Sequence, residues 1–395
     1  MKVGDLSYKS RNKIYGLLCV IAEGGLGLFM SIISENKTLS DFDGNRQNNF
    51  TLIRLIFAWL VLFGHSFAIQ PTHGLKNPVN AIFKGSEWIG SFAVHGFFVI
   101  SGFLVCASLL NRGCKDYVIS RFLRVVPGLA LCVLLSVFAL GTVLTSLSLG
   151  DYFSNPKTWE YVKNAFAFFP MEWNLPGVFE DNRREAINGS LWTLNVEVYC
   201  YFLLAFIGFF GLLGRKAIAN PTIAAVLAFS YFHFGDVPLL GGNAKWGRPG
   251  LFFLVGVFFY INRDKVPVNG KLAVFSLVML AYSFGKDWYL YVAPPFFAYL
   301  IFYFAYVIKH IDLDAKLGDI SYGVYIYAWP VQQIVAISFP QLNPYGHTVL
   351  ATAIVFGIAY LSWHYVEKNA LKLKPKLMSM TNGLPFIRNR AVSQA

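Results

Sequence analysis

Apolar runs long enough to cross a lipid bilayer recur along this chain of 395 residues. The clearest runs from Phe50 to Ile69 and reads FTLIRLIFAWLVLFGHSFAI, the length of helix that spans a bilayer's hydrocarbon core. Hydrophobic residues make up 56% of the chain and charged residues only 14%, which is more apolar surface than a soluble domain could cover. Because barrel strands alternate between apolar and polar residues, the continuous runs exclude an outer-membrane barrel. We therefore expect an all-α integral membrane protein.

The spacing of the runs predicts a single polytopic bundle of about ten transmembrane helices. The apolar segment at residues 14–33 fits an interfacial helix better than a membrane span, and an eleventh span is the alternative. The expected organisation is a cytoplasmic N-terminal segment (1–47), a membrane domain (48–370) and a basic cytoplasmic tail (371–395). The expected spans are 50–69, 88–110, 122–148, 191–214, 217–234, 249–262, 271–286, 291–308, 320–338 and 348–366.

The positive charges predict the orientation of the bundle. The formal net charge is +12, and with ten spans the Lys and Arg residues cluster in alternate connecting segments and in the tail. The positive-inside rule places those segments, and both termini, in the cytoplasm. Topology thus accounts for the charge, and we expect no nucleic-acid partner. The long connection from Asp151 to Ser190 then lies on the opposite side, where a loop of this length often belongs to a functional site.

Two ionisable residues interrupt the first span. Arg54 and His65 lie eleven positions apart, which places them on one helix face about 16 Å apart along the axis. Ionisable groups inside a span are costly and usually functional. A histidine suits general-base chemistry because its ordinary pKa lies near neutrality.

Glu197 is the carboxylate expected well inside a span, at a depth similar to that of His65. An unpaired carboxylate there would be costly, so we expect a cationic or hydrogen-bonding partner. One interpretation pairs Glu197 with Arg54 as a packing salt bridge and leaves His65 as a satisfied interior histidine. The other gives Glu197 the task of fixing the tautomer of a catalytic His65.

Three further residues are candidates for binding. Arg121 and Arg124 lie three apart at the start of the third span, so they share a helix face and could hold phosphate oxygens, or else anchor the span to anionic lipid. His95, in the second span, is either a packed interior histidine or a substrate-contacting residue. The five cysteines show no metal-ligand spacing, so we expect no metal site and no disulfide framework.

Five stretches together resemble membrane acyltransferase family 3, which includes bacterial polysaccharide O-acetyltransferases. The resemblance covers roughly residues 48–370. The matching stretches, in order, are the pair Arg54 and His65, FFVISGFL at 97–104, the group Arg121, Arg124 and Pro127, SLWTLNVEVYCYF at 190–202, and GDISYGVYIYAWPVQ at 318–332 with SWHYVEK at 362–368.

The chain departs from the family pattern at two places. Many members carry a histidine where this chain has Ala328, and an acidic residue where it has His95. These departures bear on the identity of the substrate and not on the type of reaction.

The resemblance implies transfer of an acyl group, most often acetyl, from cytoplasmic acyl-coenzyme A to a hydroxyl of a cell-surface or exported glycan or a lipid-linked sugar. Acyl-coenzyme A would be a substrate, with no permanently bound cofactor, and the membrane would be a bacterial inner membrane. The implied roles are His65 and Glu197 in catalysis, Arg54, Arg121 and Arg124 in binding the acyl donor, and Trp192, His95 and Ser101 in the substrate pocket.

Three other functions remain open at this point. A multi-span transporter of a sugar or small organic solute also places Arg, His and Glu inside the membrane, although no inverted repeat is evident. A succinyl group in place of acetyl is the main alternative within the family. A non-catalytic member that only binds a glycan or a partner is the third.

Overall fold

The computed structural model describes residues 37–71, 74–167, 171–232 and 244–380 of the chain. These residues form helices joined by mostly short connections, with one isolated β-bridge between Thr38 and Pro267, so the all-α prediction is confirmed for the described part. The long helices are α2 (Phe50–Ile69), α4 (Ile89–Leu135), α8 (Trp192–Phe209), α9 (Lys216–Phe232), α10 (Ala244–Ile261), α11 (Gly270–Ser283), α12 (Tyr289–Tyr306), α14 (Ser321–Ser338) and α15 (Pro344–Ser362). The short helices are η1 (Leu39–Phe42), α3 (Pro78–Ile82), η3 (Ser136–Gly141), α5 (Thr142–Leu144), α6 (Leu149–Ser154), α7 (Pro156–Val162), η4 (Lys163–Phe166), α13 (Leu313–Lys316), η6 (Trp363–Glu367), α16 (Lys368–Leu371) and α17 (Lys374–Met380).

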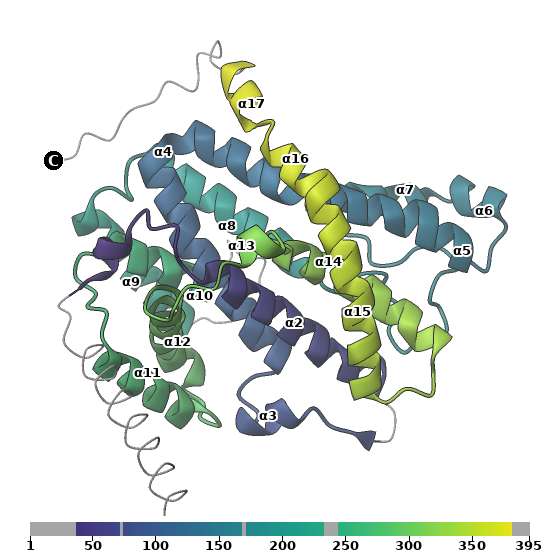
Figure 1. Cartoon of the computed structure of the whole chain (residues 1–395), viewed down its shortest axis with the longest axis horizontal. Helices are drawn as coiled ribbons and strands as arrows, with labels where there is room; N and C mark the ends of the chain where they lie inside the picture. Colours follow the sequence, from purple (N-terminus) through teal and green to yellow (C-terminus); the bar gives the residue numbers. More distant parts are fainter. Residues whose placement is uncertain (1–36, 72–73, 168–170, 233–243, 381–395) are drawn as a thin grey trace, which may run out of the picture.

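Helix α4 consists of two arms that meet at Gly113, and Figure 1 shows them diverging from a corner of the molecule. Gly113 has φ 82° and ψ 167°, a backbone conformation that is essentially restricted to glycine. The predicted spans 88–110 and 122–148 correspond to these arms, the second of which continues through η3 and α5.

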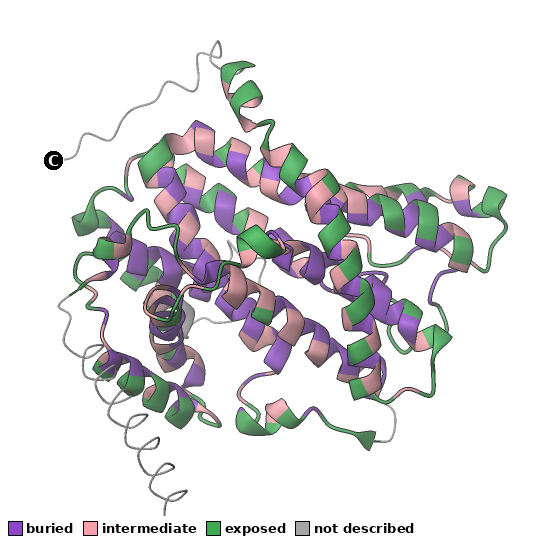
Figure 2. Ribbon diagram, in the orientation of Figure 1, coloured by how far each residue is buried: buried purple, intermediate pink, exposed green. Residues whose placement is uncertain are grey.

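The first arm of α4 lies at the centre of the bundle, against α2 on one side and α10 on the other. Its contact with α10 is unusually close. A Cβ atom on Gly102 would lie 2.0 Å from the Phe253 carbonyl oxygen, and one on Gly256 would lie 2.2 Å from that of Val99. Small residues allow helix backbones in membranes to approach in this way. Helix α14 packs against α2 and α15, and Figure 2 shows buried positions concentrated on these facing surfaces.

Five helical stretches in the described residues are long and apolar enough to cross a membrane. Helix α14 lies outside this set and carries the buried amides Gln332 and Gln333, while the apolar parts of α9, α10 and α11 are shorter than 18 residues. The predicted count of ten spans is therefore not confirmed and stays a prediction, and the segment at 14–33 lies outside the described residues. The qualifying stretches are Phe50–Ile69, Ile89–Leu144, Trp192–Phe209, Tyr289–Tyr306 and Pro344–Met380.

Large apolar side chains cover the outward faces of the helices. Phe206, Phe209 and Val349 are 64%, 66% and 71% exposed, respectively. Such a surface is unfavourable in water and suits contact with lipid acyl chains.

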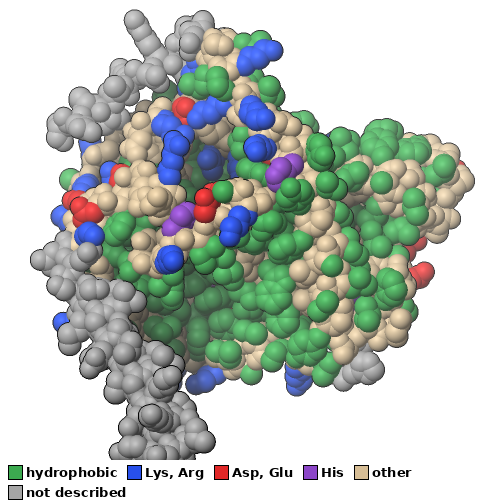
Figure 3. Space-filling view, in the orientation of Figure 1, with side chains coloured by type: hydrophobic (Ala, Val, Ile, Leu, Met, Phe, Trp, Pro, Cys, Tyr) green, Lys and Arg blue, Asp and Glu red, His purple; other side chains and the backbone are tan. Residues whose placement is uncertain are grey.

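Charged side chains gather instead at the end of the molecule that carries α13, α16 and α17, as Figure 3 shows. Lys374 of α17 contacts Asp116 of α4 at 2.8 Å, and Arg263 contacts Asp43 at 2.9 Å. These contacts join segments that the sequence assigns to one side of the membrane. The positive-inside rule predicts that this side is the cytoplasm.

The long connection predicted at residues 151–190 contains short helices, α7 and η4 among them. Its last part is hydrogen-bonded to α14. Trp329 Nε1 donates a hydrogen bond of 2.9 Å to the Ala186 carbonyl oxygen, and Asn188 Nδ2 donates one of 2.8 Å to that of Ile326. The last part of the connection thus packs against α14 at Ile326 and Trp329.

Candidate active site

Two pockets lie inside the helix bundle. The first, here called the arginine pocket, has a volume of about 100 Å³ and takes its name from Arg54, Arg121 and Arg124, which all line it. Arg54 comes from α2, and the other two come from the second arm of α4. The sequence predicted these three as a donor-binding group, and the structure brings them together.

Asp319, just before α14, links two of these arginines. Its Oδ2 atom accepts hydrogen bonds from Arg54 Nη2 at 3.0 Å and from Arg124 Nη2 at 2.7 Å. Burial by itself would raise the pKa of the Asp319 carboxyl, but Arg124 and Arg54 hold that pKa below its ordinary value. Glu367 lies 3.5 Å from Arg124 Nη1 and adds a second carboxylate. The two acids fix the arginines in place, and sequence reasoning missed both.

Arg121 makes no ion pair with another residue of the described part of the chain. Its guanidinium carbon lies 5.8 Å from the centre of the Tyr201 ring, and its Nε atom is buried without a hydrogen-bond partner there. A cation in this state, next to two others, can bind an anion. Arg121 is therefore the arginine of this pocket that is placed to bind phosphate or another anionic group.

Glu197 lines the arginine pocket rather than the surroundings of His65. It accepts hydrogen bonds from Ser101 Oγ at 2.8 Å and from the Tyr201 hydroxyl at 2.5 Å. The structure thus makes neither the expected Glu197–Arg54 salt bridge nor a Glu197–His65 hydrogen bond. Hydroxyl groups satisfy the carboxylate instead, and Ser101, predicted for the substrate pocket, is one of them.

The second pocket, here called the histidine pocket, has a volume of about 410 Å³ and is lined by His65, His95 and Trp192. His65 stacks on Trp88 with 5.4 Å between ring centres and meets the edge of Trp329 at 4.7 Å. Its Nδ1 atom is buried without a hydrogen-bond partner among the described residues. Aromatic rings, not a carboxylate, therefore orient this imidazole.

Glu87 is a further acid that sequence reasoning missed. Its Oε2 atom lies 3.1 Å from His95 Nδ1, and both side chains are almost fully buried at the wall of the histidine pocket. His95 also stacks on Phe252, with 4.1 Å between ring centres. The signal that could have found Glu87 is its position directly before the predicted second span, beside Trp88.

The two pockets meet at three residues that line both of them: Val94, Thr193 and Tyr325. The Thr193 and Tyr325 hydroxyls lie 2.6 Å apart in a hydrogen bond. This shared wall, here called the junction, separates the three arginines from the two histidines. A group held in one pocket could meet a group held in the other at this junction.

Comparison with known proteins identifies the family. The family model described as an acyltransferase domain matches residues 47–364. The chain is 31% identical over 354 residues to an "O-acetyl transferase" of Shigella phage Sf6, an alignment that covers 84% of this chain and 99% of the relative. It is 26% identical over 380 residues to "Nodulation protein 10" of Rhizobium leguminosarum bv. viciae, covering 86% and 97% of the two chains. No solved structure matches. Since the family model covers well over half of the chain, the chain belongs to this acyltransferase family and is a membrane O-acyltransferase.

Proposed function

We propose that the protein transfers an acetyl group from acyl-coenzyme A in the cytoplasm to a hydroxyl of a glycan, or of a lipid-linked sugar, on the opposite side of the membrane. The observation that carries this proposal is the pair of pockets, one lined by three arginines and one by two histidines, which meet inside the membrane domain. A two-substrate transfer between compartments needs such an arrangement. The name of the phage relative supports acetyl as the group.

The arginine pocket is the proposed donor site. Coenzyme A carries phosphates, which charge-assisted hydrogen bonds from arginine bind well. The volume of about 100 Å³ is too small for a nucleotide, because pockets for whole small molecules usually hold about 300–1,000 Å³. The donor's nucleotide would therefore stay at the mouth of the pocket, beside the arginines, and only its narrow thioester arm would enter.

The histidine pocket is the proposed acceptor site. Its volume of about 410 Å³ falls within the range for small-molecule sites. Trp88 and Trp192 offer flat apolar faces of the kind that pack against sugar rings, and Glu87 offers a carboxylate to sugar hydroxyls. Since His95 stands where many family members carry an acid, Glu87 supplies negative charge to the same wall from another position.

His65 is the proposed general base. It lines the acceptor pocket and makes no hydrogen bond with another described residue, so its imidazole can take the proton of the incoming hydroxyl. Glu197 is the proposed positioning residue of the donor pocket, where it holds Ser101 and Tyr201.

The test is the His65→Asn variant, expressed in a strain that lacks the gene. We expect the rate of acetyl transfer to fall by about 10²- to 10⁴-fold, the usual contribution of general-base catalysis. Surface-glycan O-acetylation is measured by proton NMR and mass spectrometry, and the transfer rate with labelled acetyl-coenzyme A in isolated membranes. The matched control is His347→Asn, which changes another buried histidine, one that lines neither pocket and lies 2.9 Å from the Gln332 carbonyl oxygen.

Wild type and His347→Asn should restore acetylation, and His65→Asn at an equal protein level should not. Equal restoration by all three would remove His65 as the base. A glycan that is unchanged in the deletion strain would contradict the proposed acceptor class.

A further inference from the structure

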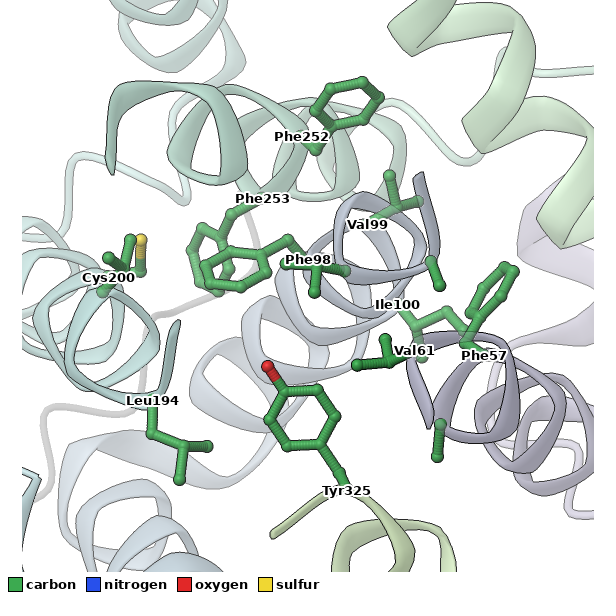
Figure 4. Packing of buried hydrophobic residues seen from close by; sticks show 14 of the residues in the cluster. Phe57, Val61, Phe98, Val99, Ile100, Leu194, Cys200, Phe252, Phe253 and Tyr325 are labelled. Carbon is green, nitrogen blue, oxygen red and sulfur yellow. The ribbon is translucent and has the colours of Figure 1, made fainter. Parts of the chain in front are cut away.

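The junction contains a hydrogen-bonded pair of hydroxyls, those of Thr193 and Tyr325. Thr193 lies in the first turn of α8 and Tyr325 lies on α14, and both residues are buried, with exposed fractions of 4% and 7%. Figure 4 shows Tyr325 projecting from α14 into the space between α4 and α8, with its hydroxyl directed away from its own helix. The third residue of the junction, Val94, is apolar, so these two hydroxyls are its polar side-chain groups.

The carbonyl oxygen of Ser190 joins the pair. It lies 3.1 Å from Thr193 Oγ1 and 3.3 Å from the Tyr325 hydroxyl, so both hydroxyls can donate to it. Two hydroxyls carry two protons, while Ser190 needs only one donor to be satisfied. If Thr193 donates to Ser190, the Tyr325 proton is held only by the Thr193 oxygen. That proton can turn to a new acceptor at the junction without leaving a buried carbonyl unpaired.

From this arrangement, and resting on the proposed function, we propose that Tyr325 donates a hydrogen bond to the carbonyl oxygen of the acyl thioester and stabilises the oxyanion formed during transfer. The thioester arrives from the arginine pocket and the acceptor hydroxyl from the histidine pocket, so the reacting carbon lies at the junction. A phenol is a better hydrogen-bond donor to an oxyanion than an aliphatic hydroxyl, because it is the stronger acid.

The proposed transfer step has two stages, addition of the acceptor hydroxyl to the thioester and loss of coenzyme A. The acceptor oxygen forms a bond to the thioester carbon, the carbonyl π electrons move onto the carbonyl oxygen, and the hydroxyl proton moves to a ring nitrogen of His65. The oxyanion, held by Tyr325, then re-forms the carbonyl as the carbon–sulfur bond breaks. The thiolate of coenzyme A leaves and takes the proton from His65, giving the acetyl ester and free coenzyme A.

The experiment compares Tyr325→Phe with wild type in inverted membrane vesicles supplied with radiolabelled acetyl-coenzyme A. Loss of one oxyanion donor should lower the maximum rate by about 10²- to 10³-fold and leave the KM for acetyl-coenzyme A nearly unchanged. The matched control is Tyr327→Phe on the same helix, which removes a buried hydroxyl that bonds Ser362 at 3.2 Å, away from both pockets. This control should keep the wild-type rate.

Thr193→Val provides a second, independent variant. It leaves Tyr325 as the remaining side-chain donor to the Ser190 carbonyl, so the phenol is drawn away from the substrate. We expect the maximum rate to fall by about 10-fold, in line with the loss of one neutral hydrogen bond in the transition state.

The outcomes separate this inference from the proposed function. If wild-type vesicles show no transfer from acetyl-coenzyme A, the proposed function fails and the inference fails with it. If wild type is active and Tyr325→Phe retains its maximum rate, or loses activity through KM alone, only the inference is overturned. Loss of activity in Ser190→Ala without loss of activity in Tyr325→Phe would also overturn it. The Ser190 hydroxyl would then be the donor, since Ser190 lines the histidine pocket and this hydroxyl is buried without a partner among the described residues.

Discussion

At the scale of single residues, the cations of the site and Glu197 could be predicted from the sequence, and the other acids could not. Arg54 and His65 stand out because they interrupt an apolar span, where ionisable groups are rare. Asp319 and Glu87 lie just outside spans, where carboxylates are common and carry no such signal. Their partners are 265 and eight positions away in sequence, so only the packed bundle reveals these contacts.

Replacing Asp319 by Asn should destabilise the protein by about 3 kcal/mol, because it leaves two largely buried arginines without their shared carboxylate. The measurement is unfolding in detergent. Asp264→Asn is the control, since the Asp264–Lys216 pair is 49% and 43% exposed and its loss should cost less than about 1 kcal/mol. Equal losses in the two variants would show that Asp319 is not a structural centre of the arginine pocket.

The stability that Asp319 contributes should depend on pH. Because the pKa of Asp319 is lowered in the folded state, its contribution to stability is present above the unfolded-state pKa of about 3.9 and is lost as the pH falls through the folded-state value. The difference in stability between wild type and Asp319→Asn should therefore stay constant from about pH 7 to pH 5 and narrow below about pH 4. A difference that widens in acid would contradict this assignment.

At the scale of elements, hydropathy predicted where most helices lie but not how they bend. Helix α2 has the predicted bounds, 50–69, and most other predicted spans overlap a single helix. The exceptions are 88–110 and 122–148, which form the two arms of α4 and meet at Gly113, where the backbone is not helical. The chain contains 34 glycines, and nothing local in the sequence shows which one adopts a positive φ at a turn between helices.

Gly113→Ala should destabilise the fold by about 1–3 kcal/mol, since an L-residue at φ 82° and ψ 167° is strained. Gly357→Ala in α15 is the matched control, because a Cβ there would meet no atom within 4 Å and alanine favours helices by about 1 kcal/mol. Thermal unfolding in detergent should show a lower midpoint for Gly113→Ala alone. A midpoint equal to that of wild type would mean that the corner of α4 does not depend on glycine.

At the scale of the whole molecule, the site consists of two pockets that the sequence suggested only in part. The eleven-residue separation of Arg54 and His65 predicted two groups at different depths on one helix face, and the structure places them in different pockets. The separation of Glu197 from His65 could not be predicted, because it depends on the rotation of α8 about its axis and on the hydroxyls of Ser101 and Tyr201. The junction depends in the same way on how α4, α8 and α14 meet.

The measurement that tests the central claim most directly is the sidedness of transfer. Inverted and right-side-out membrane vesicles are prepared from the deletion strain carrying the wild-type gene, and membrane-impermeant radiolabelled acetyl-coenzyme A is added outside each. If the arginine pocket opens to the cytoplasm and the histidine pocket to the opposite side, the label enters glycan only in inverted vesicles. Label that enters glycan in right-side-out vesicles, or equally in both, would contradict transfer between two pockets on opposite sides of the membrane.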